Sequence, residues 1–480
     1  LFHDIMCENK KYINYERKLS SQIFKELLLM CGIPKIKANI MYHCVDNCRY
    51  AVYKIRDRLA GGWKVIYGCI AEKLGHSFSK EIHNRLFDYS YELKEVPNTE
   101  FDTFMRKKEF KAINVTIPYK ERVIPYLDWV SDTAQKIGAV NTVVNEDGFL
   151  RGYNTDFSGM CALIEKEKIV LKGKKVLILG SGGTSKTAAA VAEYMECGSV
   201  YRISRDGKEG CLTYETAAAL HSDAEVIINT TPVGMYPNIG RSAICLDDYP
   251  NMEAVVDAVY NPLRPKLVCD AQKKGIHAVG GLYMLVAQAA LAAEKFLQTA
   301  VPVSEIDRVY REIVSEKQNI VLIGMPGSGK STTGRFLAEQ LGRTFVDTDE
   351  EIVKKEQKPI PQIFDEVGEK GFRKIEAEVI LDLARMQNAV IATGGGAVLH
   401  ATNIELLKEN GRVYFIDRSL DDIAVTSDRP LSSSRADLQK RYEERYPLYC
   451  ASCDKHICIG NDLRVNTELI KKDFLLRKYL

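Results

Sequence analysis

The sequence predicts an α/β protein with two regions of parallel sheet, preceded by a short and mostly helical segment. From Val65 onward, short apolar runs that suit buried strands alternate with helical patterns, which is typical of strand–helix–strand units. Two of these runs end in glycine-rich turns that lead into helices. A length of 480 residues also allows about three domains.

Composition narrows the function classes. Hydrophobic residues make up 46% and charged residues 27% of the chain, which excludes wholesale disorder. A net charge of +2 gives no footprint for nucleic acid, and the apolar run at 280–293 is too short to span a membrane. Thirteen cysteines, an odd number, favour a reducing compartment, and residues 1–15 show no secretory signal. We therefore expect a cytoplasmic enzyme that binds neither nucleic acid nor membrane.

Residues 1–63 form an extension of unknown role. They carry eleven Lys or Arg and six Asp or Glu, so their net charge is +5. Apolar spacing predicts helices over Ser20–Gly32 and Ile40–Leu59. Cys44 and Cys48, beside His43, have the spacing of half a metal site, but ordinary thiols are the simpler interpretation.

The first glycine turn follows the predicted strand Lys174–Leu179 and precedes an alanine-rich helix, Lys186–Met195. Such a turn lets a pyrophosphate approach the helix N-terminus closely, although its third glycine position is occupied by Ser185. The next predicted strand ends at Arg205, which suits the 2′-phosphate of NADP. Asp206 follows directly, so use of NAD stays open.

Several blocks around this turn resemble the shikimate dehydrogenase family over about residues 65–296. The blocks, in family order, are Tyr67–Ile70, His76–Ser79 with His83 and Asn84, Asn114–Lys120, Gly138–Thr142, Gly152–Asp156, Asn229–Met235, Val259–Pro262 and Gly281–Leu285 with Gln288. The resemblance implies NADPH-dependent reduction of 3-dehydroshikimate in a domain spanning 64–300. Its substrate lobe would cover about 64–160 and its Rossmann-like nucleotide lobe about 161–280, with the C-terminal helices closing on the substrate lobe.

The same resemblance assigns the site residues of this domain. Lys120 would protonate the developing alkoxide, oriented by Asp156, because a lysine ammonium can stabilise and protonate such an oxygen. The implied substrate ligands are Ser77, Ser79, Thr116, Lys120, Asn141, Asp156, Tyr260 and Gln288. The implied NADP ligands are Gly180, Ser181, Gly182, Gly183, Thr184, Ser204, Arg205, Met235 and Gly281. Lys80 replaces the proline that usually follows the second serine, which puts the local turn in doubt.

The second glycine turn begins a domain over 318–480, after a predicted linker at 301–317. Asn319–Ile323 leads into Gly324–Ser331, which satisfies the phosphate-binding pattern G-x-x-x-x-G-K-S between a strand and a helix. Lys330 should reach the β/γ-phosphates, and the hydroxyl of Ser331 should ligate Mg²⁺. Asp347 and Asp349 end the next predicted strand and point the same way, so one suits the metal and the other the acceptor hydroxyl.

Further blocks in this domain resemble shikimate kinase across nearly all of 319–480. They are Gly368-Glu369, Phe372-Arg373 with Glu376, Thr393–Gly396, Arg429–Leu431 and Arg445–Tyr449. The resemblance places Asp349 on the acceptor, Arg373 and Arg445 on its carboxylate, and Gly394, Gly395 and Gly396 around the pocket. It makes Arg429 the lid arginine facing the transferred phosphate. The implied ATP ligands are Gly324, Gly327, Ser328, Gly329, Lys330, Ser331, Thr332 and Arg429, with Ser331 and Asp347 at the metal.

Two features depart from the kinase pattern. The lid stretch Ser419–Ser434 is short, and the arginine that usually stacks on adenine is absent from Leu420–Asp428, so nucleotide affinity should differ. Four residues after the Arg445 helix have ligand-like spacing, with ordinary thiols as the alternative: Cys450, Cys453, His456 and Cys458.

Taken together, the sequence predicts a bifunctional enzyme that reduces 3-dehydroshikimate with NADPH and phosphorylates the resulting shikimate with ATP and Mg²⁺. One alternative is a dehydrogenase that prefers quinate and NAD, fused to the kinase. Another is a non-catalytic metabolite sensor, which the presence of Lys120, Asp156, Lys330, Ser331 and Asp349 disfavours. The oligomeric state stays open between monomer and homodimer.

Overall fold

The computed structural model describes residues 65–75, 77–208, 210–423 and 435–476. These belong to two compact units. The first contains the chain up to Trp129 together with Thr142–Gly152, and the second contains Val130–Asn141 together with Tyr153 onward. The helices expected within residues 1–63, the thiols there, and the lid residue Arg429 lie outside the described residues.

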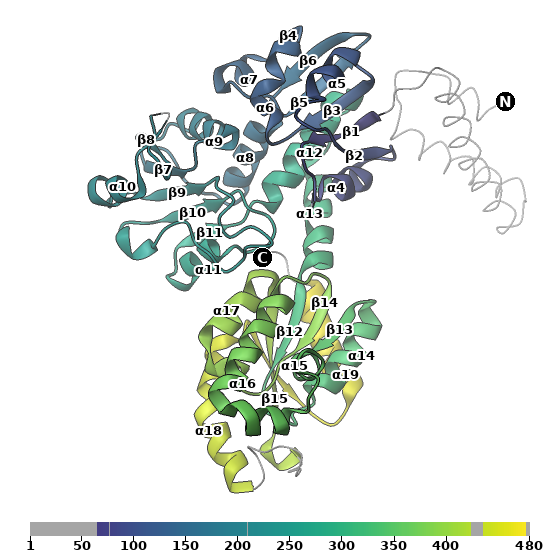
Figure 1. The fold of residues 1–480 in the computed structure, drawn as a ribbon, viewed down its shortest axis with the longest axis vertical. Coiled ribbons are helices and arrows are strands. Elements are labelled where there is room, and N and C mark those ends of the chain that lie inside the picture. The colour runs from purple at the N-terminus through teal and green to yellow at the C-terminus, as the bar shows by residue number, and fades with distance from the viewer. Residues whose placement is uncertain (1–64, 76, 209, 424–434, 477–480) are drawn as a thin grey trace, which may run out of the picture. The chain divides into compact units, whose positions relative to one another are not determined.

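The first unit is built on a six-stranded mixed sheet in the order β2-β1-β3-β5-β6-β4 (Figure 1). Its strands are β1 (Val65–Ala71), β2 (Tyr91–Glu95), β3 (Phe110–Val115), β4 (Trp129–Val130), β5 (Thr142–Glu146) and β6 (Phe149–Tyr153). Its helices are α4 (Ser79–Leu86), α5 (Phe101–Lys107), α6 (Tyr119–Arg122) and the short η1 (Ile124–Tyr126). We expected a parallel sheet, and β1 does pair in parallel with β2 and β3, but β3 and β5 are antiparallel. Strand direction in a sheet depends on which strands pair and not on the apolar pattern within one strand. The two-residue turn Asp147-Gly148 adds a further antiparallel connection, because so short a link cannot join β5 and β6 in parallel.

The second unit begins with a five-stranded parallel sheet in the order β11-β10-β9-β7-β8. Its strands are β7 (Lys175–Leu179), β8 (Ser199–Ile203), β9 (Val226–Asn229), β10 (Ala254–Asp257) and β11 (His277–Val279). Its helices are α7 (Asp132–Ile137), α8 (Thr155–Lys166), α9 (Gly183–Tyr194), α10 (Tyr214–Leu220), α11 (Lys266–Lys273) and α12 (Leu282–Leu297), with η2 at Leu246–Asp248. The strand order reverses between β7 and β9. In open α/β sheets, ligands bind at such a reversal, beyond the carboxyl ends of the strands.

Helices α8 and α12 pack unusually closely in this unit. A Cβ added at Gly159 would lie 2.8 Å from the Cβ of Gln288 and 2.8 Å from the carbonyl oxygen of Met284. A larger residue at position 159 would therefore push α12 away, and with it the amide of Gln288. The stretch 301–317, expected as a linker, contains helix α13 (Val303–Lys317).

The remaining part of the second unit has its own five-stranded parallel sheet, in the order β13-β14-β12-β15-β16. The strands are β12 (Asn319–Ile323), β13 (Thr344–Asp347), β14 (Ala389–Ala392), β15 (Gly411–Arg418) and β16 (Lys455–Ile459). The helices are α14 (Lys330–Leu341), α15 (Thr348–Glu356), α16 (Ile360–Ala384), α17 (Ala401–Asn410), α18 (Arg435–Ser452) and α19 (Leu463–Leu476), with η3 (Ala397–Leu399) and η4 (Leu420–Asp422).

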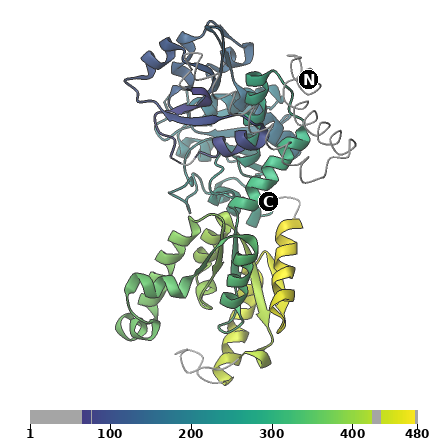
Figure 2. The same ribbon diagram turned by 90° about the vertical axis from the view of Figure 1, so that its right-hand side faces the viewer.

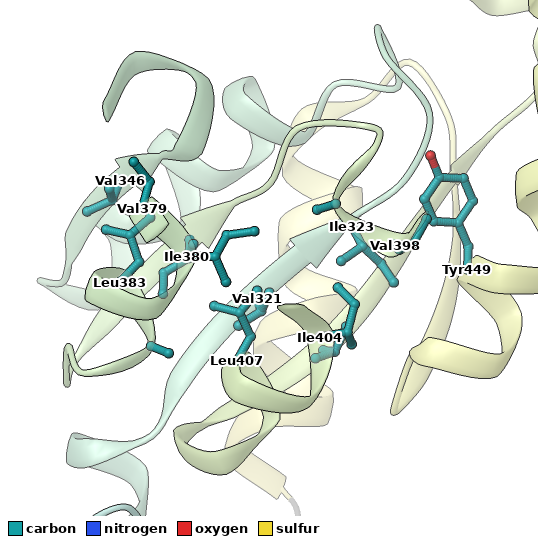
Figure 3. Close-up of a cluster of buried hydrophobic side chains, with 14 of the residues drawn as sticks. Val321, Ile323, Val346, Val379, Ile380, Leu383, Val398, Ile404, Leu407 and Tyr449 are labelled. Carbon is teal, nitrogen blue, oxygen red and sulfur yellow. The ribbon is translucent and has the colours of Figure 1, made fainter. Parts of the chain in front are cut away.

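Helices cover both faces of this last sheet (Figures 1 and 2). On one face, Val321 and Ile323 pack against Ile380 of α16 and Leu407 of α17, as Figure 3 shows. On the other face, alternate strand residues pack against α14 and α19, including Ile470. Burial on both faces explains why β12 reads as a continuous apolar run.

No helix in the described part of the chain is long and apolar enough to cross a membrane. The nine cysteines that the structure describes are all free thiols.

Candidate active sites

The first unit places two serines of the predicted substrate site at the start of α4. Ser79 is the first residue of this helix, and its backbone N–H donates to the Ser77 Oγ at 3.2 Å. The Ser77 hydroxyl in turn donates to the Ser79 Oγ at 3.0 Å. Lys80, which replaces the usual proline, is an exposed residue inside the first turn of α4. The two hydroxyls therefore lie together despite that substitution.

Thr116 and Lys120 follow β3, the parallel neighbour of β1. The N–H of Thr116 donates to the carbonyl of Ile70 at 3.0 Å, and the N–H of Tyr119 donates to the carbonyl of Thr116 at 2.9 Å. This tight turn leads into α6, where Lys120 is half-buried. The serines after β1 and the Thr116–Lys120 turn after β3 thus follow adjacent strands at the same end of the sheet.

The second unit holds the other polar residues predicted to bind this substrate. The Thr155 N–H donates to the Asn141 Oδ1 at 2.7 Å, and the Asn141 Nδ2 donates to the Gln288 Oε1 at 3.5 Å. Asp156 is buried in the first turn of α8, directly after Thr155. Asn141, Asp156 and Gln288 therefore converge within one unit. The predicted pairing of Asp156 with Lys120 joins two different units and stays a prediction.

The first glycine turn lies at the carboxyl end of β7, where the strand order reverses. Gly180 has φ +121°, and a Cβ there would lie 2.6 Å from the Thr230 Oγ1. Ser185, at the position of the third glycine of the usual motif, donates its hydroxyl to the carbonyl of Gly180 at 2.6 Å. The serine that replaces the third glycine of the motif therefore makes a hydrogen bond that closes the turn. Thr184 is partly exposed in the first turn of α9, whose N-cap is Gly182.

Two adjacent residues after β8 have opposite charges and different surroundings. Asp206 accepts from the Ser204 hydroxyl at 3.2 Å and forms an ion pair with Lys208 at 3.1 Å. Arg205 is exposed and has no ion-pair partner among the described residues. The guanidinium is thus available to an anion, whereas the carboxylate is already engaged.

The remaining predicted NADP and substrate residues lie on loops of the same lobe. Met235 is 40% exposed in the turn after β9, and Tyr260 is half-buried after β10. Gly281 caps α12, and a Cβ there would lie 2.3 Å from the carbonyl oxygen of Ala258. At this edge, buried Asp257 accepts from the Asn229 Nδ2 at 2.9 Å, and burial raises its pKa to about 7.

The second glycine turn forms a loop around its own lysine. The Lys330 Nζ donates to the carbonyls of Gly324 at 3.0 Å and Met325 at 2.8 Å, and the side chain is buried. The Ser331 hydroxyl donates to the Asp347 Oδ2 at 2.6 Å. These two oxygens are hard ligands of the kind that Mg²⁺ prefers, so the predicted metal residues fit that ion. Gly327, Ser328 and Gly329 complete the loop, and Thr332 is exposed in the first turn of α14.

Asp349 is in the first turn of α15, which directly follows β13. Its backbone N–H donates to the Asp347 Oδ1 at 3.0 Å, which fixes the relative placement of the two carboxylates. Burial, with a further contribution from the charge of Asp347, raises the pKa of Asp349 to about 6. A Cβ at Gly394 would lie 2.5 Å from the Asp349 Oδ1, so the glycine leaves room for this carboxylate.

Two buried arginines converge on the same glycine turn. The Arg373 Nη1 donates to the Glu376 Oε2 at 2.8 Å, and a Cβ at Gly396 would lie 2.3 Å from that nitrogen. The Arg445 Nη1 donates to the carbonyl of Gly395 at 3.0 Å. Among the described residues, the Arg373 Nε and the Glu376 Oε1 have no hydrogen-bond partner, and burial raises the pKa of Glu376. The turn is therefore lined by a carboxylate and by two guanidinium groups.

Sequence reasoning missed two residues that shape this site. The Thr348 Oγ1 accepts from the N–H of Gly394 at 2.7 Å, and the Tyr449 hydroxyl donates to the carbonyl of Gly395 at 2.6 Å. Thr348 lies between the two predicted aspartates, and Tyr449 ends the block that begins at Arg445. Both positions were therefore inside recognised motifs, but a hydrogen bond to a distant turn leaves no trace in local spacing.

Two surface recesses adjoin this second site. One, of about 360 Å³, is lined by Asp349, Glu350, Val353, Lys354 and Ile360. The other, of about 670 Å³, is lined by Phe336 of α14 and by Asn461, Asp462, Leu463 and Arg464. Arg418 donates to the Asn461 side chain and lies 3.7 Å from where a Cβ of Gly329 would be. The larger recess thus lies beside the glycine loop.

Comparisons with known families find both regions. The model of the shikimate dehydrogenase substrate-binding domain matches residues 69–143, and the shikimate kinase model matches residues 326–473. The chain is 36% identical over 265 residues to a shikimate dehydrogenase (NADP(+)) of Clostridium perfringens, covering 52% of this chain and 98% of that one. The corresponding protein of Halothermothrix orenii is 37% identical over 256 residues, covering 47% and 89%.

Solved structures are similar to about half of the chain. A shikimate 5-dehydrogenase from Thermus thermophilus in complex with NADP(H) and shikimate is 29% identical, with a TM-score of 0.47, and covers 52% of this chain and 99% of that one. A chorismate mutase/shikimate 5-dehydrogenase fusion protein from Clostridium acetobutylicum is 33% identical, with a TM-score of 0.49, and covers 52% and 97%.

Proposed function

Because the chain belongs to the shikimate dehydrogenase family and also carries a shikimate kinase domain, we propose that the two polar sites described above perform consecutive steps. The protein is a bifunctional enzyme of the shikimate pathway, with an NADP-dependent shikimate dehydrogenase and an ATP-using shikimate kinase. The residues that carry out each reaction, and the limits of each domain, are our assignments.

In the dehydrogenase, we assign the proton transfer to Lys120. NADPH supplies the hydride when bound, which leaves negative charge on the carbonyl oxygen of 3-dehydroshikimate. A half-buried ammonium at the start of α6 can stabilise and then protonate that oxygen. In the first unit, our candidates for binding the polar substrate are Ser77, Ser79 and Thr116. In the second unit, they are Asn141, Asp156 and Gln288.

We assign selectivity for NADPH to Arg205. This guanidinium lies beyond β8, where a dinucleotide-binding fold holds the adenosine ribose, and the structure gives it no ion-pair partner among the described residues. Asp206 could instead bind the 2′-hydroxyl of NADH, but its carboxylate is occupied by Ser204 and Lys208. The charge that remains available is therefore positive, which favours the cofactor with a 2′-phosphate.

In the kinase, phosphoryl transfer depends mostly on positioning and on charge neutralisation. Lys330 would leave the loop carbonyls to meet the β/γ-phosphates, and Ser331 with Asp347 would hold Mg²⁺. Asp349 would accept a hydrogen bond from the attacking hydroxyl of shikimate, and its raised pKa makes it a stronger base than an ordinary aspartate. We place the nucleotide base in the 670 Å³ recess beside Gly329.

The shikimate carboxylate would bind between Arg373 and Arg445. Both guanidinium groups are buried beside the turn Gly394–Gly396, and Asp349 faces the same turn. No described residue accepts a hydrogen bond from the Arg373 Nε, so a carboxylate could satisfy this donor. This convergence of two arginines and one carboxylate behind a phosphate-binding loop is the observation that carries the kinase assignment.

One assay tests the proposed pair of reactions. The full chain is incubated with 3-dehydroshikimate, NADPH, ATP and Mg²⁺, and both shikimate and shikimate 3-phosphate are quantified. We expect shikimate 3-phosphate with all components and shikimate alone when ATP is omitted. A chain that oxidises quinate with NAD faster than it oxidises shikimate with NADP would overturn the dehydrogenase assignment. Failure to phosphorylate added shikimate would overturn the kinase assignment independently.

A further inference from the structure

Three potential metal ligands meet where β15 and β16 end. The two strands pair in parallel, with Asp417 beside Cys458 and Phe415 beside His456. The His456 Nε2 lies 2.8 Å from the Asp417 Oδ2 and 3.8 Å from the Cys458 Sγ. One potential ligand atom from each of these residues lies within 4.8 Å of the others. The group combines a carboxylate, an imidazole and a thiol.

The strand geometry explains why these side chains share a face. Ile457 and Ile459 alternate with the ligands and are buried in the core with α19, so His456 and Cys458 point to the opposite face. On that face, the His456 ring stacks on Phe415 with centroids 4.7 Å apart and meets the edge of Tyr446 at 6.1 Å. These two rings restrict the orientation of the imidazole.

The cluster differs from the one that sequence spacing suggested. Cys453 donates its thiol to the carbonyl of Cys450 at 3.5 Å and packs against the core, and it is not part of the group. Asp417, which is 39 residues before His456, takes its place.

We propose that Asp417, His456 and Cys458 form a binding site for one Zn²⁺ ion. Zinc takes nitrogen, sulfur and oxygen ligands in tetrahedral geometry, at about 2.0–2.3 Å. Two such ligands, one nitrogen and one sulfur, lie roughly 3.6 Å apart in a tetrahedron of that size. This is close to the 3.8 Å between the His456 Nε2 and the Cys458 Sγ. Because Cys458 is exposed, the fourth position is open to water.

An ion bound by Asp417, His456 and Cys458 would affect the phosphate-binding loop that contains Gly329. Asp417 is followed by Arg418 and Cys458 by Ile459, and both following residues approach Gly329 of the loop. A Cβ at Gly329 would lie 3.7 Å from the Arg418 Nη1 and 3.8 Å from the Ile459 Cδ1. Drawing Asp417 and Cys458 onto one ion should therefore change the position of the residues beside the loop, and with it the KM for ATP.

The test for the site is binding of Co²⁺ and Zn²⁺ to the full chain, and it does not depend on the proposed kinase activity. Cys44→Ser and Cys48→Ser are introduced first, because those thiols also have ligand spacing. One equivalent of Co²⁺ should give a thiolate charge-transfer band, and Zn²⁺ should abolish it. Cys458→Ser should remove the band, and Asp417→Asn or His456→Ala should weaken Zn²⁺ binding about 10–100-fold or more.

Matched variants make the result decisive. Cys245→Ser removes an exposed thiol elsewhere and Cys453→Ser removes the excluded neighbour, so each should change Zn²⁺ affinity less than about twofold. A band that survives in Cys458→Ser, or that is lost in Cys453→Ser, would overturn the proposed ligand set. For the link to the loop, which rests on the proposed kinase activity, Zn²⁺ should change the KM for ATP in the parent chain and not in Cys458→Ser. Equal responses in both chains would overturn that link.

Discussion

The two glycine-rich turns of this protein begin in the same way, but different chemical groups close them. Each turn follows a central strand, β7 or β12, which has a neighbouring strand on both sides. Each turn also begins with a glycine at positive φ, +121° at Gly180 and +149° at Gly324. A Cβ would lie 2.6 Å from the Thr230 Oγ1 at Gly180 and 2.4 Å from the carbonyl oxygen of Ile416 at Gly324. In both turns, the first residue must lack a side chain because a neighbouring strand or its loop passes too close.

The turns differ in what closes them. A neutral hydroxyl, that of Ser185, closes the first turn onto the carbonyl of Gly180. The ammonium of Lys330 closes the second onto the carbonyls of Gly324 and Met325. A turn that only holds a dinucleotide leaves the reacting charges to other residues, whereas one that takes part in phosphoryl transfer carries its own cation. The second turn therefore supplies a cation of its own, whereas the acid predicted for the dehydrogenase, Lys120, lies outside the first turn.

The largest expected effect tests the cation of the second turn. Lys330→Ala should lower the kinase kcat/KM by roughly 10²–10³-fold, because a buried charge that stabilises the transferred phosphate is lost. Dehydrogenase activity of the same variant serves as the internal control and should be unchanged. A kinase that keeps its rate without Lys330 would show that the second turn is no more than a phosphate cradle.

The next effect tests the assignment of the dehydrogenase acid to Lys120. Lys120→Ala should lower the dehydrogenase kcat by about 10²-fold and change the KM less, as expected for a positioned proton donor. Lys107→Ala, which removes an exposed lysine at the end of α5, is the matched control. Steady-state rates with shikimate and NADP decide between the two. A similar kcat for both variants would remove Lys120 from the chemistry.

A pair of glycine variants separates the fold of the first turn from its ligand. Gly182 has no atom within 4 Å of an added Cβ, so Gly182→Ala should leave the thermal midpoint unchanged. It should raise the KM for NADPH about tenfold, because the second glycine of this motif lets the pyrophosphate approach. Gly180→Ala should instead destabilise the fold by about 1–3 kcal/mol, through strain at positive φ. If Gly182→Ala binds NADPH normally, the pyrophosphate does not lie at this turn.

A smaller effect concerns selection between cofactors. Arg205→Ala should raise the KM for NADPH by about tenfold and leave the KM for NADH nearly unchanged, because a charge-assisted contact to phosphate is lost. Lys208→Ala removes a nearby cation that already pairs with Asp206, and it should not alter the preference. A wild-type enzyme that prefers NADH would show instead that Asp206 sets the selection.

The smallest expected effect is on stability in the second site. Since the folded state raises the pKa of Asp349 to about 6, the native chain binds more protons than the unfolded chain between about pH 4 and 6. The free energy of unfolding should therefore fall as pH rises through that window. Asp349→Asn should be more stable than wild type at pH 7.5, by up to about 3 kcal/mol, and equally stable near pH 4.

Thermal melts across this pH range give the comparison, with the exposed Asp365→Asn as the control. A wild-type chain whose stability relative to Asp349→Asn does not change between pH 4 and 7.5 would contradict the raised pKa.

Local sequence determined much of this protein. The strand, turn and helix around Gly180 and around Gly324 form where the motifs predicted them, because apolar period, glycine and helix start all act within about ten residues. The ordered blocks also predicted both activities. A mixed first sheet was not predicted, because strand direction depends on which strands pair and not on the pattern within one strand.

Tertiary structure alone decided which distant groups meet. Spacing predicted Cys450 and Cys453 as neighbours of His456 and Cys458, but neither belongs to the group, and pairing of β15 with β16 brings Asp417 there instead. Likewise, the hydroxyls of Thr348 and Tyr449 form hydrogen bonds to the turn Gly394–Gly396 from 46 and 54 residues away. Local sequence fixes the direction of a side chain on its own element, whereas its partner depends on how the elements pack, and that is set by burial over the whole core.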